Sequence, residues 1–138
     1  MSIQVALQNI NWLAVLVATL STMLIGFLYY SPWSFGNVWM KAAGFTEEDL
    51  KGTSPMIYVK TLLLSGLTAV ALALFIQADP SLYQGIKIGV IAGACFGCTA
   101  TVTNALFDRK SLVYFMIISG HIMLNFIAIG AILGAWPK

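Results

Sequence analysis

Residues 112–136 read LVYFMIISGHIMLNFIAIGAILGAW and contain no Asp, Glu, Lys or Arg. An α-helix needs about 20 apolar residues to cross the roughly 30 Å hydrocarbon core of a bilayer. Residues 11–30, 56–77 and 88–107 form three further apolar runs of similar length. With only 9% charged residues and a mean hydropathy of +0.88, the chain lacks the polar surface of a water-soluble globule. The sequence therefore predicts an integral membrane protein.

We predict an all-α fold, an integral membrane four-helix bundle, with residues 1–138 forming a single domain. The spans are expected at residues 11–30, 56–77, 84–107 and 112–134. No positively charged segment precedes the first run, so we expect a retained span there and not a cleaved signal peptide.

The segment after the first span predicts a short interfacial amphipathic helix over residues 32–43. Ser31-Pro32 has the pattern of an N-cap followed by proline at the first helical position, and Gly44 is a typical helix end. Such a helix is too short to cross the bilayer, so we expect it to lie along the headgroup boundary. The expected interfacial anchors are aromatic: Tyr29, Tyr30, Trp33, Phe35 and Trp39.

Three other positions carry helix-start signals. Thr46 precedes three acidic residues, which favours a short helix that ends at Gly52. Ser54-Pro55 and Asp79-Pro80 repeat the cap-plus-proline pattern before the second and third spans.

Small residues predict how the spans pack. In the third span, glycine recurs at every fourth position, which keeps one helix face free of side chains with a drift of about 40° per step. Close contact across such faces drives helix association in lipid. The face can pack inside one bundle or form a subunit interface, and we expect a homo-oligomer. The packing glycines are Gly85, Gly89, Gly93 and Gly97, with Gly26, Gly130 and Gly134 on other spans.

His121 and Asn125 are four residues apart, so they share one face of the fourth span near its midpoint. An ionisable side chain at this depth is a candidate functional residue. Thr22 and Ser65 lie at similar depth and Asn104 lies nearer a helix end, which makes a polar ligand site possible. The alternative is a neutral His121 that bonds Asn125 and fixes the helix register.

Cys95 and Cys98 form a C-x-x-C in the middle of the third span. A thiolate is disfavoured there, and two cysteines are too few for a zinc site, so we expect packing residues. No catalytic triad, carboxylate pair or phosphate loop is visible, and we expect no enzyme activity, cofactor or metal. A net charge of +2 with scattered basic residues gives no nucleic-acid footprint. The expected partner is the lipid bilayer.

The distribution of Lys and Arg predicts the orientation. The connections between spans one and two and between spans three and four carry Lys41, Lys51, Lys60, Arg109 and Lys110, against Lys87 and Lys138 on the other side. By the positive-inside rule, these two loops are cytoplasmic and both termini lie outside the inner membrane.

Two sets of segments together form a recognisable signature. The N-terminal segments are Asn11-Trp12, Ala14-Val15, Tyr29-Tyr30-Ser31-Pro32, Phe35-Gly36, Trp39 and Gly44-Phe45-Thr46-Glu47-Glu48. The C-terminal positions are Asn104, Leu106-Phe107, His121 and residues 130–136. In these segments the chain resembles the small bacterial integral membrane proteins catalogued as domain of unknown function 1761. The resemblance implies four spans and a bacterial membrane location, and it brings no catalytic residues. Tyr29 stands where the family often has Trp, and the C-x-x-C is not a family feature.

These observations favour a non-enzymatic membrane protein that self-associates through small-residue helix faces and binds or scaffolds within the bilayer. The first alternative is a small transporter or channel subunit, with His121 and Asn125 lining a path. The second is a membrane redox or haem-binding protein that uses His121 or the thiols.

Overall fold

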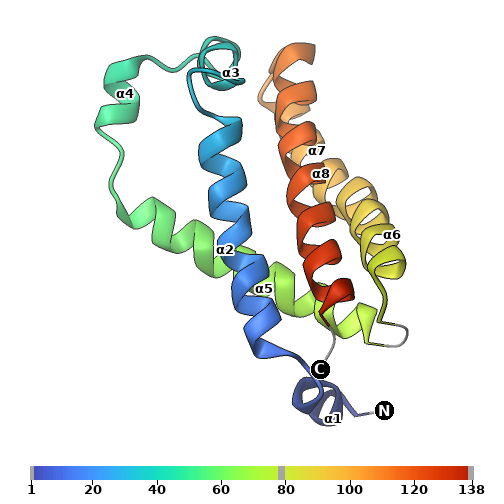
Figure 1. Ribbon diagram of the computed structural model, residues 1–138. Helices are drawn as coiled ribbons and strands as arrows, with labels where there is room; N and C mark the ends of the chain where they lie inside the picture. The colour runs from blue at the N-terminus through green and yellow to red at the C-terminus, as the bar shows by residue number, and fades with distance from the viewer. Residues whose placement is uncertain (1, 78–79, 137–138) are drawn as a thin grey trace.

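The structure is a computed structural model that describes residues 2–77 and 80–136, and every regular element in these residues is helical (Figure 1). Four helices are long and apolar enough to cross a membrane, which confirms the predicted all-α fold with four spans. They are α2 (Trp12–Tyr29), α5 (Met56–Ile76), the continuous helix over Leu82–Phe107, and α8 (Leu112–Ala135).

The third span is one continuous helix built from three segments. They are α6 (Leu82–Ala92), the π-helix η1 (Gly93–Cys98) and α7 (Thr99–Phe107). The π segment widens the turns in the middle of the span, and no sequence pattern predicted it. The Thr99 hydroxyl donates hydrogen bonds to the carbonyl oxygens of Cys95 at 2.6 Å and Phe96 at 3.3 Å, so it satisfies acceptors within the widened segment.

A short N-terminal helix, α1 (Ile3–Gln8), precedes the first span and was not predicted. Gln77, at the end of α5, donates from Nε2 to the Ala6 carbonyl oxygen at 2.8 Å. This bond links α1 to a residue distant in the sequence. Patterns of neighbouring residues cannot predict such a contact. Asn11 donates from Nδ2 to the Trp136 carbonyl oxygen at 3.2 Å, so the start of α2 lies beside the end of α8.

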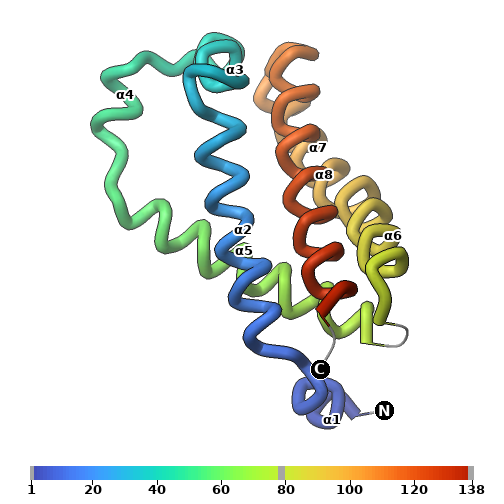
Figure 2. Tube along the Cα trace, in the orientation of Figure 1, coloured from blue at the N-terminus to red at the C-terminus, as the bar shows by residue number. Residues whose placement is uncertain are grey.

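The predicted start of the interfacial helix is wrong. Helix α3 spans Gly36–Ala43, and the residues before it form turns. Ser31 does not act as an N-cap, because its hydroxyl donates to Leu28 in the preceding helix at 2.8 Å. The chain reverses so tightly that a Cβ on Gly36 would collide with the Tyr30 carbonyl oxygen. Figure 2 shows α3 across the end of α2 and beside the start of α8.

The other helix starts follow the predicted chemistry in part. Helix α4 (Glu47–Lys51) begins with a capping box between Thr46 and Asp49. The N-cap position of α5 is Pro55 and not the predicted Ser54, which lies one residue earlier and whose hydroxyl accepts a bond from the Met56 backbone N–H at 3.3 Å. The cap of α6 is Ser81, whose hydroxyl accepts from Gln84 N at 3.2 Å. Asp79, the predicted cap, lies outside the described residues.

The closest helix pair is α6–η1 against α8, and the glycine face of the third span lies between them. A Cβ on Gly89 would meet the Phe126 carbonyl oxygen, and one on Gly97 would lie 2.6 Å from Ile122 Cγ2. Because i→i+5 bonding winds the chain more slowly than an α-helix, η1 offsets the drift of the glycine row and turns Gly97 back toward α8. This face is therefore occupied within one chain.

Helix α5 crosses α2 obliquely and leaves the bundle toward its N-terminal end (Figure 1). Its buried residues all lie in its C-terminal half: Ala69, Leu72, Ala73 and Ile76. Ala69 packs with Ala14 and Ala18 of α2 in a core cluster where each of these three side chains is 0% exposed. The small side chains allow the two backbones to approach closely at the crossing.

Candidate functional site

The polar residues predicted on the fourth span lie in a cluster between α2 and α8 that we call the histidine–tyrosine cluster: His121, Asn125, Tyr29 and Tyr30. The His121 ring centroid lies 4.8 Å from that of Tyr30 and 5.4 Å from that of Tyr29. Gly26 faces the imidazole, because a Cβ there would lie at an ordinary contact distance of 3.6 Å from His121 Nε2. Gly26 and Tyr29 of α2, together with Tyr30 directly after the helix, thus form one wall around the imidazole.

Tyr29 holds this arrangement together. Its hydroxyl donates to the Ile117 carbonyl oxygen of α8 at 2.8 Å, and the side chain is only 9% exposed. Tyr29, predicted as an interfacial anchor, is thus buried and bonded to a neighbouring helix, and its depth in the membrane stays a prediction. Gly120 makes room for it, because a Cβ at that position would lie 2.5 Å from the Tyr29 hydroxyl oxygen.

A row of aromatic rings connects the cluster to α3. Phe35 packs on Tyr29 with ring centroids 4.7 Å apart, and Trp39 packs on Tyr30 at 5.2 Å. These two predicted anchors therefore contact the tyrosines of the cluster. Trp33 is different, because 94% of its side chain is exposed. The sequence analysis assigned Tyr30 to the membrane boundary. The signal that could have linked it to this site is its four-residue spacing from Gly26, which puts both residues on one helix face.

Asn125 gives the cluster an unused hydrogen-bonding group. Its Nδ2 lies 3.2 Å from His121 Nε2, so the amide and the imidazole are bonded along α8. Its Oδ1 is buried and has no hydrogen-bond partner among the described residues. A buried acceptor without a partner costs about 1–3 kcal/mol. A water molecule or a ligand with a donor group would remove that cost.

The other predicted polar residues, Thr22, Ser65 and Asn104, lie at different positions relative to this cluster. Helices α2 and α8 are antiparallel, and Gly26 faces His121, so Thr22 and Asn125 lie one turn further along at the same level. Thr22 is buried, and its hydroxyl donates to Thr19 of its own helix at 2.7 Å. Ser65 is half-buried on α5, and Asn104 is exposed on α7. The structure brings Thr22 to the level of the cluster and leaves Asn104 out of it.

The C-x-x-C lies within the π segment. Both cysteines are free; Cys95 is exposed, and Cys98 donates from Sγ to the Ser119 carbonyl oxygen at 3.7 Å. Residues 2–77 and 80–136 contain no group of three or more His, Cys, Asp or Glu side chains placed to hold a metal ion. The histidine–tyrosine cluster therefore offers hydrogen-bonding groups surrounded by aromatic rings.

Comparison with known proteins places this chain in a family. No curated protein and no solved structure matches it. The family described as "Protein of unknown function (DUF1761)" matches over residues 13–134, a range that contains the histidine–tyrosine cluster and all four apolar helices except the first residue of α2 and the last residue of α8. The chain is a member of the DUF1761 family of proteins.

Proposed function

We propose that this protein is a non-catalytic, multi-pass protein of the bacterial inner membrane that associates with further copies of itself. The DUF1761 match and the four apolar helices support a membrane protein of this kind. The self-association rests on one observation, the partly covered small-residue row of α5.

The row consists of Thr61, Ser65, Ala69 and Ala73, which follow one another at four-residue intervals along α5. Ala69 and Ala73 are buried, whereas Ser65 is half-buried and Thr61 is exposed. Helix α2 therefore covers only the half of the row that contains Ala69 and Ala73. The row of small side chains continues beyond it to Ser65 and Thr61. A helix from a second copy that packs on Thr61 and Ser65 would cover the remainder by the close small-residue contact that stabilises helix pairs in lipid.

The polar groups inside the spans support a structural role more than a path for solutes. The membrane-depth hydroxyls of Thr19, Thr22 and Thr101 each donate to a carbonyl oxygen of their own helix. Thr61 and Thr68 do the same on α5. Hydroxyls used in this way are satisfied without water, so they do not need to line a polar channel.

The test compares two matched threonine substitutions in lipid vesicles. Thr61→Leu adds bulk to the uncovered half of the row and is expected to reduce self-association, measured by energy transfer between labelled copies. Thr103→Leu is the control, because Thr103 is also exposed and also donates to its own helix, but on α7. Equal energy transfer in Thr61→Leu and the unaltered protein would show that α5 is not the contact.

We propose the orientation that the positive-inside rule gives, with α3, α4 and the α7–α8 connection on the cytoplasmic side. Lys41 and Lys51 on one connection and Arg109 and Lys110 on the other support it. Single cysteines introduced at Asn37 and Pro80, in a variant without Cys95 and Cys98, test it in intact cells. A membrane-impermeant thiol reagent should label position 80 and spare position 37; the reverse pattern would invert the orientation.

A second candidate is a transporter or channel subunit, which the buried Asn125 Oδ1 favours because it is an acceptor open to a donor on a polar solute. In that case Asn125→Leu should abolish solute flux into proteoliposomes while assembly is unchanged. The haem alternative fits poorly, because His121 Nε2 already faces Asn125 at 3.2 Å and Gly26 on the neighbouring helix. A haem absorbance band in the purified protein would favour it nonetheless.

A further inference from the structure

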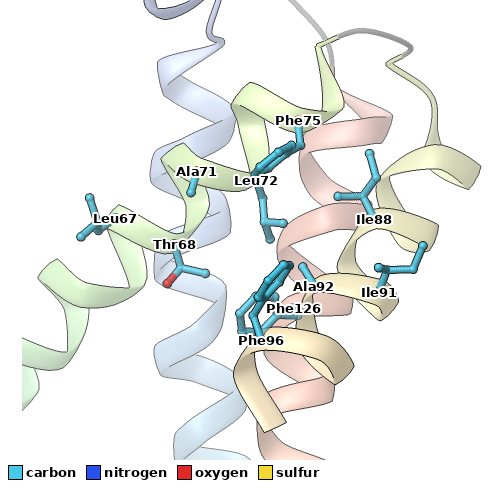
Figure 3. Close-up of a pocket in the computed structure, with 10 residues that line it drawn as sticks. All are labelled: Leu67, Thr68, Ala71, Leu72, Phe75, Ile88, Ile91, Ala92, Phe96 and Phe126. Carbon is cyan, nitrogen blue, oxygen red and sulfur yellow. The ribbon is translucent and has the colours of Figure 1, made fainter. Parts of the chain in front are cut away.

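An apolar groove opens between α5 and the α6–η1 segment, with a wall from α8 (Figure 3). Its volume is about 560 Å³, within the range of small-molecule sites. Three aromatic side chains line it, Phe75 from α5, Phe96 from η1 and Phe126 from α8. Among its described lining residues only Thr68 is polar, and its hydroxyl donates to Leu64 within α5. The groove therefore suits a hydrocarbon occupant.

The length of the groove along the third span is close to the thickness of one leaflet of the bilayer. Its lining runs along the third span from Ile88, in the second half of α6, to Phe96 in η1, near the middle of the continuous helix over Leu82–Phe107. At 1.5 Å per residue this distance is about 12 Å along the helix axis. Half of the hydrocarbon core is about 15 Å thick. A chain that enters at the membrane boundary would therefore reach the aromatic residues near the middle of the bilayer.

Among the described residues, one cation, Lys87, directly precedes the lining residue Ile88 at the α6 end of this groove. Lys87 lies four residues before the lining residue Ile91, so it is one turn nearer the start of α6 on the same face. Its side chain is exposed, and its stem can extend along the helix and place the ammonium group among the headgroups. The other Lys and Arg residues of the described chain lie in α3, α4, the first turns of α5 and the α7–α8 connection.

We infer that this groove binds one acyl chain of an anionic phospholipid, with the phosphate of the same lipid bonded to the Lys87 ammonium group. The chain packs against the C-terminal half of α5 on one side and the α6–η1 segment on the other, and Lys87 selects the charge of the headgroup. The lipid site goes beyond the proposed self-association and does not depend on it.

Native mass spectrometry of the detergent-purified protein tests the charge selection. The probes are phosphatidylglycerol and phosphatidylcholine with identical chains, supplied in equal amounts. One lysine near an anionic headgroup corresponds to a preference of roughly fivefold. We expect Lys87→Gln to remove this preference and Lys60→Gln, an exposed lysine on α5 away from the groove, to keep it. A preference that survives Lys87→Gln would overturn the proposed headgroup contact.

Filling the groove tests the chain site. Ala71 lines the groove and is exposed, so Ala71→Phe can occupy the space without displacing a buried side chain. We expect this variant to lose retained lipid of both types, while Ala100→Phe, at an exposed position on α7, retains it. If Ala71→Phe changed the subunit number and left lipid retention unaltered, the groove would be a protein contact and the proposal would be wrong. The Thr61→Leu variant separates this result from a failure of self-association.

Discussion

Gly85 and Gly130 face each other backbone to backbone: the carbonyl oxygen of each occupies the position that a Cβ on the other would take. Gly134 continues the contact, since its Cα lies 2.9 Å from the position of a Cβ on Gly85. No side chain fits between α6 and α8 at this level. Van der Waals contact between the two backbones, and not hydrophobic burial, is what holds these helices together in lipid.

Gly85→Ala should destabilise the protein by about 1–3 kcal/mol, because the added methyl group forces two packed backbones apart. The measurement is unfolding in mixed micelles with increasing denaturing detergent. Gly66→Ala is the control, because a Cβ there would lie at an ordinary 3.6 Å from Thr19 Cγ2. Since glycine costs about 1 kcal/mol in a helix, this control should be as stable as the parent or more so. Equal losses in both variants would contradict the backbone contact.

Tyr29→Phe should cost about 1 kcal/mol, because it removes the donor to the Ile117 carbonyl oxygen and keeps the ring. The same unfolding assay measures the loss. Tyr58→Phe, at an exposed tyrosine whose ring packs on Phe27 at 5.8 Å, should leave stability within about 0.5 kcal/mol of the parent. A Tyr29→Phe protein with unaltered stability would show that the hydroxyl bond contributes nothing net.

Lys110→Met should loosen α3 from the rest of the molecule. The Lys110 ammonium group donates to the Ala43 carbonyl oxygen at 2.8 Å, where α3 ends at Gly44. A cation at a helix C-terminus contributes about 0.3–1 kcal/mol. Faster hydrogen exchange in residues 36–43 would report the loss, and Lys51→Met, at an exposed position on α4, should leave these amides unchanged. Unaltered exchange in Lys110→Met would mean that other contacts hold α3.

The Thr46–Asp49 capping box predicts a pH dependence for α4. The Thr46 backbone N–H and then its hydroxyl hold the pKa of the Asp49 carboxyl below its ordinary value of 3.8. Because the folded pKa is the lower one, this stabilisation is complete above pH 3.8 and is lost as the pH falls through the folded pKa. Below that pH the first turn of α4 should fray.

Carboxyl NMR titration of Asp49 in micelles measures this effect. Thr46→Ala should raise the Asp49 pKa toward its ordinary value, and Thr53→Ala, which removes a hydroxyl bonded to the Asp49 backbone carbonyl oxygen, should leave it unaltered. The same pKa in Thr46→Ala and the parent would contradict the role of the hydroxyl.

Short-range patterns in the sequence predicted the elements well and their contacts poorly. Hydropathy located the four spans to within a few residues, and the start of α4 at Thr46 was predicted from four consecutive residues. The start of α3 was misplaced because Gly36 is needed for a tight reversal against Tyr30, a requirement set by the chain path. Helix α1 was missed because its anchor, Gln77, is distant in the sequence.

The candidate site was predicted in part. The spacing of His121 and Asn125 placed them on one face, and the structure bonds them at 3.2 Å. The two tyrosines of the cluster were assigned to the membrane boundary, because aromatic residues at the end of a span usually lie there. The rotation of α2 against α8 decides that the Tyr29 hydroxyl donates to the Ile117 carbonyl oxygen and that His121 lies opposite Gly26. Sequence spacing alone does not predict this rotation.

The sequence by itself predicted a lipid environment, four spans and a glycine face on the third span. Hydropathy and helical spacing can both be read from residues that are close together in the chain. The tertiary structure decided that the glycine face meets α8 of the same chain, that η1 keeps Gly97 in that contact, and that α5 leaves an apolar groove open beside Phe96. These outcomes depend on how each helix is rotated and tilted against its neighbours. Packing between residues far apart in the chain sets that geometry.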